Sequence, residues 1–201
     1  VVVVTPSQDM ILGNYYLTME IKGEENEGHF YKDFDEAYMA YKNGYITLHT
    51  RIFIDISYLP ESKFSNVKLP SNYIFTTLGK MIFNNILPKE FPYLNEATEE
   101  NLTKATPLKY FLDKNDIKGS YDRLIASEPV KAFIKKNIAR IIAEVFKRFK
   151  ITETSIMLDR IKDLGFKYST IAGFTISMAD VIKYDGKDER IAQADKKVDR
   201  D

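Results

Sequence analysis

The 201-residue sequence has no cysteine and only two histidines, His29 and His49. The absence of cysteine excludes disulfide bonds and thiolate chemistry. Two histidines without any thiol cannot assemble a structural zinc site of the usual Cys/His type. A chain without cysteine fits a reducing compartment, so we expect a cytoplasmic protein.

The sequence also lacks net charge and long apolar runs. Its 29 Lys and Arg residues balance 29 Asp and Glu residues, so no overall field attracts a nucleic acid or an anionic membrane. The apolar run that opens the chain, residues 1–4, is far too short for a signal peptide or a membrane span. We therefore expect no membrane partner, and any contact with nucleic acid must be local.

What the sequence does contain is enough apolar material for a core. Hydrophobic residues make up 44% of the chain and aromatic residues 13%, which suffices for one large domain or two small ones. The chain opens without an initiator Met, and residues 188–201 keep helical spacing through Ile191, Ala194 and Val198 without a Gly or Pro stop. From both ends we expect a piece of a larger polypeptide.

Periodicity and capping residues predict an α+β fold of mixed strands packed with several helices. Pro6 and Ser7 separate an opening strand from a helix over 8–19, because Pro cannot join a strand ladder and Ser is a good N-cap. The turn-rich stretch 89–120 is predicted to be a surface excursion. The other predicted elements are a helix that Asp33 begins and Gly44 ends, a strand over 45–57, a strand over 73–77, a helix over 78–87 capped by Thr77, a helix over 130–149, a helix from Thr152 to Leu164 ended by Gly165, and a loop, strand and turn over 166–180.

The predicted strand over 45–57 alternates strictly, with its isoleucines on one face, and we expect only this face to be buried. His49 and Arg51 lie two residues apart on the opposite face, where an imidazole and a guanidinium could contact a phosphate together. The alternative is that both are ordinary residues of the solvent-facing side of a strand. The sequence alone leaves both interpretations open.

The segment Asp33-Phe34-Asp35-Glu36 concentrates three carboxylates, which could hold Mg²⁺ together with substrate phosphates. The alternative is a helix N-terminus, where acidic residues satisfy free N–H groups and oppose the helix dipole. No Gly turns the backbone there, and no third Asp stands at a suitable offset. We therefore expect a capped helix and no metal site.

Two helical stretches raise the question of partners. The first has an apolar stripe that is predicted to be buried, formed by Phe133, Ile134, Ile138, Ile141, Ile142, Val145, Phe146 and Phe149. Its basic cluster could line a nucleic-acid path or form a solvated helix face, and consists of Lys135, Lys136, Arg140, Lys147, Arg148 and Lys150. The second stretch, 155–165, could bind a partner, but a Met, Leu and Ile stripe at helical spacing ordinarily belongs to a core.

Motifs of a self-contained active site are missing from the sequence. It has no G-x-x-x-x-G-K-[ST], no G-x-G-x-x-G after a strand, and no G-x-S-x-G. We therefore predict no catalytic residue in this chain. Two other classes stay open: a non-catalytic module that binds RNA or protein through the basic helix over 131–150, and an independent nucleotide-using enzyme.

Four stretches carry a resemblance to a known family: TPSQDMILGNYYLTME (5–20), DFDEAYMAYKNGYITLHTRI (33–52), TTLGKMIFNNILPKEFPYLNE (76–96) and IIAEVFKRFKITETSIMLDRIKDLGFKYSTIAGFTISMAD (141–180). In order, spacing and content they resemble the beta prime subunit, the largest catalytic subunit of bacterial DNA-directed RNA polymerases. The resemblance implies that residues 1–178 form the pore domain and that 179–201 begin the funnel. These parts would surround the secondary channel, through which NTPs enter and the RNA 3′ end extrudes.

The resemblance also implies which components lie elsewhere. The family's Mg²⁺ ligands, bridge helix, trigger loop and zinc ligands fall outside these residues, so Mg²⁺ is expected in the parent nucleotidyltransferase and not in this chain. The segment Asp33-Phe34-Asp35 is then the start of a structural helix. The implied partners are the rest of beta prime, the beta, alpha and omega subunits, template DNA, nascent RNA, NTPs and transcript-cleavage factors at the rim.

The resemblance places the polar corner before the first helix beside the active centre. Gln8 and Asp9 are the residues that we expect near the incoming nucleotide or the RNA 3′ end, because a helix N-terminus offers free N–H groups to phosphate. The rest of that helix is expected to enter the core and fix the corner. Residues 95–127 depart most from the family pattern, and we expect them to decorate the outside.

Overall fold

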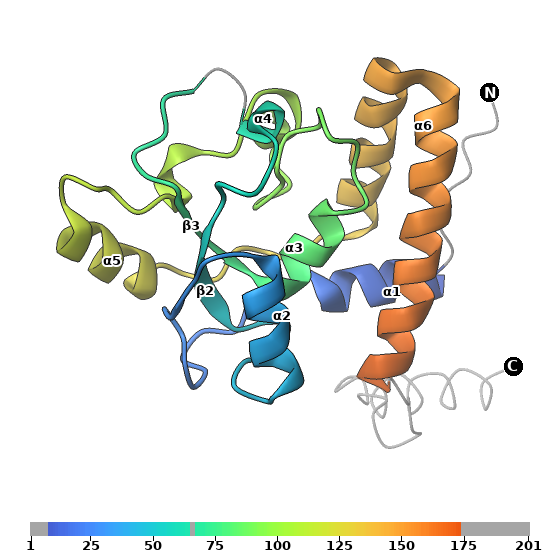
Figure 1. The fold of residues 1–201 in the computed structure, drawn as a ribbon. Coiled ribbons are helices and arrows are strands. Elements are labelled where there is room, and N and C mark those ends of the chain that lie inside the picture. Colours follow the sequence, from blue (N-terminus) through green and yellow to red (C-terminus); the bar gives the residue numbers. More distant parts are fainter. Residues whose placement is uncertain (1–7, 65–66, 174–201) are drawn as a thin grey trace, which may run out of the picture.

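The computed structural model describes residues 8–64 and 67–173. Within these residues the chain is α+β, with a three-stranded mixed sheet packed among six α-helices (Figure 1), which confirms the predicted fold class. The elements are α1 (Gln8–Leu17), β1 (Phe30–Tyr31), α2 (Phe34–Lys42), β2 (Arg51–Asp55), the 3₁₀ helix η1 (Glu61–Phe64), β3 (Tyr73–Thr77), α3 (Leu78–Asn84), α4 (Glu99–Thr103), the 3₁₀ helix η2 (Leu108–Tyr110), α5 (Ile117–Ala126) and α6 (Lys135–Ala172).

Local caps set several helix boundaries as predicted. Asp33 has extended backbone and its Oδ1 accepts a backbone N–H of the first turn of α2 at 2.9 Å. Gly44 follows the end of α2 with a φ of 76°, a conformation that favours glycine. Thr77 Oγ1 accepts a backbone N–H of α3 at 3.2 Å and so begins that helix. The predicted cap Ser7 and the opening strand lie outside the described residues.

β2 is the central strand of the sheet. It pairs in parallel with β1 and antiparallel with β3, so that Phe30, Phe53 and Phe75 stand side by side across the three strands. Phe53 and Phe75 belong to a small apolar cluster with α5. Ile52 and Ile54 point the other way, into the main core. The two faces of the central strand are therefore both buried.

The prediction of a long strand over 45–57 with one buried face is wrong in two respects. The strand extends only over Arg51–Asp55, and Arg51 and Phe53 on its second face are as buried as the isoleucines on the first. Alternation shows which residues share a face, but it does not show what packs against that face. Here the second face is covered by a segment from much later in the chain.

That segment belongs to residues 95–127. The prediction that these residues decorate the outside is wrong, and so is the prediction that 89–120 form a surface excursion. Leu112 N donates to Tyr73 O at 3.0 Å, and Phe111 forms a β-bridge with β3. Both Phe111 and Leu112 are buried. Phe111 and Leu112 therefore pair with the edge of β3, and α5, which belongs to the same segment, covers the second face of the sheet (Figure 1).

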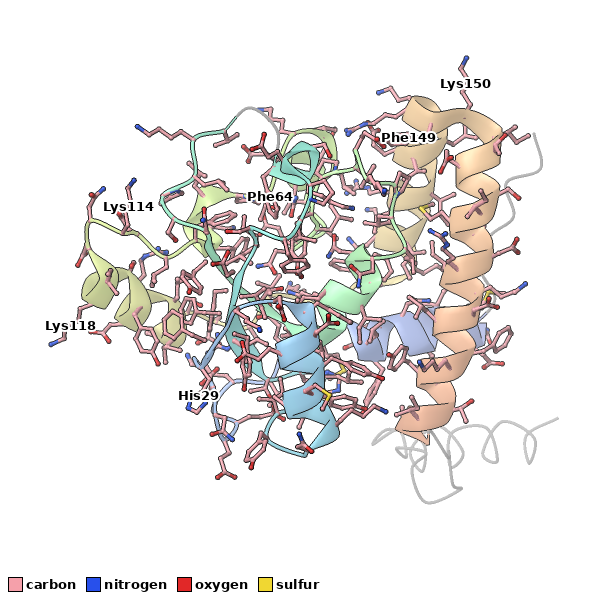
Figure 2. All side chains as sticks on the ribbon, viewed as in Figure 1. His29, Phe64, Lys114, Lys118, Phe149 and Lys150 are labelled. Carbon is pink, nitrogen blue, oxygen red and sulfur yellow. The ribbon has the colours of Figure 1, made fainter. Side chains whose placement is uncertain are left out.

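α6 is a helical hairpin. Its backbone leaves helical geometry at Lys150, where φ is 62° and ψ is −158°. Figure 1 shows two arms that join at the top of the molecule, and Figure 2 places Lys150 at this turn. The predicted break between two helices is therefore confirmed, two residues before the expected cap Thr152.

The predicted end of the second helix at Gly165 is wrong. The second arm continues to Ala172, and Gly173 ends it with a φ of 60°. Of the loop, strand and turn predicted over 166–180, the first part is helical, and 174–180 lie outside the described residues. Gly165 is helical and lies in close contact with Met10 of α1.

The apolar stripe of the first arm is buried at most of its positions. The buried members, as predicted, are Phe133, Ile138, Ile141, Ile142 and Val145, and Phe149 is partly buried. Ile134 and Phe146 contradict the prediction, because they are 51% and 40% exposed. The helix begins only at Lys135, later than predicted, so helical spacing does not apply to Ile134, and Phe146 lies outside the arc of the arm that packs against the core.

Candidate functional site

The first turn of α1 carries the two residues predicted to lie near the reacting nucleotide. α1 begins at Gln8, and both Gln8 and Asp9 are exposed. The first backbone N–H groups of a helix have no acceptor within the helix, so they attract anions. Asp9 adds a negative charge at the same end, which stabilises the helix dipole. The structure thus brings both residues together at one exposed helix end.

The rest of α1 is fixed by direct backbone contact with two other helices. It lies between α3 and the arms of α6 (Figure 1). A Cβ added to Gly13 would stand 1.8 Å from the carbonyl oxygen of Gly165 in α6. A Cβ added to Gly79 in α3 would stand 1.9 Å from the carbonyl oxygen of Leu17. Glycine is therefore required at these crossings, and α1 cannot shift sideways toward either neighbour.

Three polar side chains in and just after α1 bind backbone atoms from far along the chain. The bonds run from Asn14 Nδ2 to Ile161 O (3.0 Å), from Phe133 N to Thr18 Oγ1 (2.9 Å), and from Val130 N to Glu20 Oε2 (2.8 Å). Each joins residues more than one hundred positions apart. Together they tie α1 and the residues just after it to the second arm of α6 and to the segment that leads into the first arm.

A buried ion pair reinforces this anchor. Lys80 Nζ lies 2.5 Å from Glu20 Oε1, with side chains 0% and 4% exposed, and also donates to Asn95 O at 2.7 Å. Burial lowers the pKa of Lys80, and the Glu20 carboxylate opposes that shift. The sequence analysis missed this pair, although a lysine between apolar residues in the sequence LGKMIF was a signal for a buried, paired charge.

His49 and Arg51 do not lie on a solvent-facing surface as predicted, since they are only 5% and 1% exposed. The Arg51 guanidinium donates to Ser127 O at 2.8 Å, to Ile125 O at 2.9 Å and to the Glu27 carboxylate. The prediction is wrong because the end of α5 and the turn after it cover Arg51, whereas His49 packs against α1. Arg51 therefore holds α5 against the sheet, through the chain's own oxygens in place of a phosphate.

The His49 ring contacts Tyr16 of α1 edge to face, with centroids 4.6 Å apart. Burial lowers the pKa of His49 below its ordinary value of 6.5, while the Met19 backbone and the Glu24 carboxylate oppose the change. The imidazole is therefore neutral at neutral pH, and its contribution to stability depends on staying neutral.

Acidification is expected to destabilise the chain in part through His49. The unfolded imidazole takes up a proton at about pH 6.5, whereas the buried one does so at lower pH, so a fall in pH favours unfolding. His49→Phe keeps an aromatic ring beside Tyr16 and removes the titration. Urea denaturation at about pH 7 and about pH 5.5 should show a smaller loss of unfolding free energy in the variant. Equal losses in both proteins would contradict this assignment.

The carboxylates at 33–36 are confirmed as a helix start. Besides the Asp33 cap, Glu36 Oε2 accepts the backbone N–H of Lys32 at 2.6 Å, so the acidic groups bind backbone donors. In the part of the chain that the structure describes, no group of three or more His, Cys, Asp or Glu side chains could hold a metal ion. Asp33 and Glu36 therefore act as capping groups at the start of α2.

The basic cluster lies largely on the exposed side of the first arm of α6. Its exposed members are Lys135, Lys136, Arg140, Lys147 and Lys150. Arg148 differs, because its Nη2 donates to Leu102 O at 2.7 Å and its Nε to Glu144 Oε1 at 3.0 Å. Arg148 therefore ties α4 to the hairpin. Among the described residues, no helix has the length and apolarity needed to cross a membrane.

These features define a scaffold domain that holds one exposed helix end in a fixed position. The sequence model of the family RNA polymerase Rpb1, domain 3, matches residues 2–181. The chain belongs to this family.

Relatives of the chain are named DNA-directed RNA polymerase subunit beta′. Those of Bacillus cytotoxicus, Bacillus cereus and Bacillus anthracis are 55%, 54% and 53% identical to it, over 199, 198 and 198 residues. Each alignment covers 98% of this chain and 16% of the relative. The resemblance seen in the sequence is thereby confirmed, and the chain spans only a small part of the length of these relatives.

Proposed function

We propose that this chain is part of a cytoplasmic DNA-directed RNA polymerase, a nucleotidyltransferase that transcribes DNA into RNA from NTPs. Its family and its identity to beta′ subunits over 98% of its length support this proposal. Among the described residues there is no group of three or more His, Cys, Asp or Glu side chains that could hold a metal ion, and we propose no chemical step for them. Mg²⁺ and its ligands would come from other parts of the polymerase, and this chain supplies geometry.

In this proposal residues 1–178 are the pore domain that shapes the secondary channel, and 179–201 begin the funnel. NTPs would enter by this channel, and the RNA 3′ end would extrude through it. The partners would be the rest of beta prime, the beta, alpha and omega subunits, template DNA, nascent RNA and NTPs, with transcript-cleavage factors at the rim.

One observation carries the assignment of Gln8 and Asp9 to the neighbourhood of the nucleotide or the RNA 3′ end. The first turn of α1 is exposed, while the remainder of the helix is held by backbone contact at Gly13 and by buried bonds. A group that positions a phosphate needs both properties, because access without rigidity does not orient a reactant.

Gln8→Ala is expected to raise the KM for NTPs in an RNA polymerase reconstituted with the full-length subunit. Loss of a hydrogen bond to a charged group costs about 1.5 kcal/mol, which corresponds to about tenfold. The measurement is single-nucleotide addition on a preformed elongation complex. Lys118→Ala, an exposed substitution on α5, is the matched control and should leave KM unchanged. Unchanged kinetics in Gln8→Ala would remove this residue from the site.

A further inference from the structure

The first turn of α1 is held from within the protein by the second arm of α6. Asn14 Nδ2 donates both to Met10 O, one turn earlier in α1, at 2.7 Å and to Ile161 O in α6 at 3.0 Å. On the same side, a Cβ added to Gly165 would stand 2.4 Å from the Cα of Met10. Met10 directly follows Asp9, so whatever holds Met10 also sets the place of the exposed pair.

The amide of Asn14 can bridge two carbonyl oxygens, which side chains of similar size, such as leucine and aspartate, cannot do. Two carbonyl oxygens, of Met10 and Ile161, converge on one point, and an NH₂ group supplies two donors from one atom. A leucine has no donor, and an aspartate would oppose both carbonyls with its own charge. The bridge therefore depends on asparagine chemistry and not on side-chain volume.

Asn14 is not the side chain expected at this position if it served only to stabilise the fold. Asn14 is 0% exposed, and its Oδ1 is buried without a hydrogen-bond partner in the described structure. An unpaired buried acceptor costs free energy that an apolar side chain of similar size would avoid. The presence of an amide here is therefore explained best by the bridge that its NH₂ group forms between the Met10 and Ile161 carbonyl oxygens.

We infer that Asn14 is a positioning residue for the nucleotide-facing turn, which acts by bridging the Met10 carbonyl of α1 to the Ile161 carbonyl of α6. This inference rests on the proposed role of Gln8 and Asp9. In this inference the second arm of α6 fixes the position of the exposed first turn of α1. Without the bridge, the first turn keeps its helical bonds and its backbone contact with Gly165 but loses its hydrogen bond to that arm.

The test is a double-mutant cycle of Asn14→Leu and Gln8→Ala in a polymerase reconstituted with the full-length subunit. We expect Asn14→Leu to raise the KM for NTPs about three- to tenfold, because a small misplacement of an orienting group is costly. Since Asn14 acts through Gln8, the double variant should stay within about twofold of the larger single effect. The kcat should change less than KM in each case.

Melting temperatures and a control variant show whether a rise in KM comes from a misplaced turn or from damage to the fold. Asn14→Leu should leave the melting temperature of the polymerase close to that of the parent, since it removes a donor and an unpaired acceptor together. Ser169→Ala, a substitution at a partly buried position on the same arm, should change neither KM nor stability. Asn14→Asp, which keeps the shape and removes the NH₂ group, should raise KM at least as much as Asn14→Leu.

The outcomes distinguish this inference from the function on which it rests. If Gln8→Ala raises KM while Asn14→Leu does not, or if the two effects simply add, Asn14 is not a positioning residue and the proposed role of Gln8 stands. If Gln8→Ala has no effect, the proposed role of the turn fails and the inference fails with it. A rise in KM that only accompanies a large fall in melting temperature would also overturn the inference.

Discussion

Replacing Lys80 with methionine is expected to lower the free energy of unfolding by about 3–5 kcal/mol, because a buried charge then loses its partner. The Glu20 carboxylate would remain beside an apolar side chain, and the carbonyl of Asn95 would lose its donor. No water can reach this site freely, since both charged side chains are almost fully buried. Urea denaturation of the isolated chain measures the loss.

A second substitution tests whether the pair itself causes this loss. In Lys80→Met/Glu20→Met no unpaired charge remains, and an apolar replacement of both partners is often close to neutral. The double variant should therefore regain stability relative to Lys80→Met, although the N–H of Val130 loses its acceptor. A double variant that is less stable than Lys80→Met would show that the charges are not coupled.

Gly165→Ala is expected to destabilise the chain, in the opposite direction to the usual effect of this substitution in a helix. Alanine normally stabilises a helix interior relative to glycine by about 1 kcal/mol. Here the added Cβ would stand 2.4 Å from the Cα and 2.5 Å from the carbonyl oxygen of Met10. Backbone atoms cannot rotate away, so α1 must move, and we expect a loss of about 2 kcal/mol or more.

Thermal and urea denaturation of Gly165→Ala should be compared with those of Ser169→Ala. Ser169 lies one turn further along the same arm and is partly buried, so its replacement tests a change in the same helix away from the glycine crossing. It should change stability by no more than about 0.5 kcal/mol. If Gly165→Ala is as stable as the parent or more stable, the two helices are not in backbone contact.

Features set by neighbours in sequence could be predicted from the sequence. Asp33 and Thr77 begin helices through side chains that reach N–H groups three residues later, and Gly44 ends one through its own backbone. These interactions need no knowledge of the fold. The α+β class and the break near Lys150 followed from the same kind of local information.

Features set by distant segments could not be predicted in this way. The alternation predicts an open face for Arg51, because it gives no sign of the segment, more than seventy residues later, that binds the guanidinium. The sequence predicts a helix end at Gly165, but the effect of a glycine depends on whether another backbone approaches it. The partner of Lys80 lies sixty residues earlier, beyond the reach of any periodicity.

The candidate site depended on resemblance more than on local pattern. A helix start at Gln8 and Asp9 is a common feature, and the residues alone gave no reason to prefer it to other helix ends. The resemblance implied that reason, and the structure added the anchor at Gly13 and Asn14 behind the exposed turn. The anchor residues were missed because a Gly or Asn within a helix has no distinctive sequence signal.

The central claim, that this chain holds the first turn of α1 beside the reacting nucleotide, is tested most directly by site-specific photo-crosslinking. A photoreactive amino acid would replace Gln8 in the reconstituted polymerase, and Lys118 in a control, since Lys118 lies at the far side of the molecule from α6 (Figure 2). The account predicts that position 8 crosslinks to the RNA 3′ end or to the incoming NTP and that position 118 does not. Equal crosslinking at both positions, or none at position 8, would contradict it.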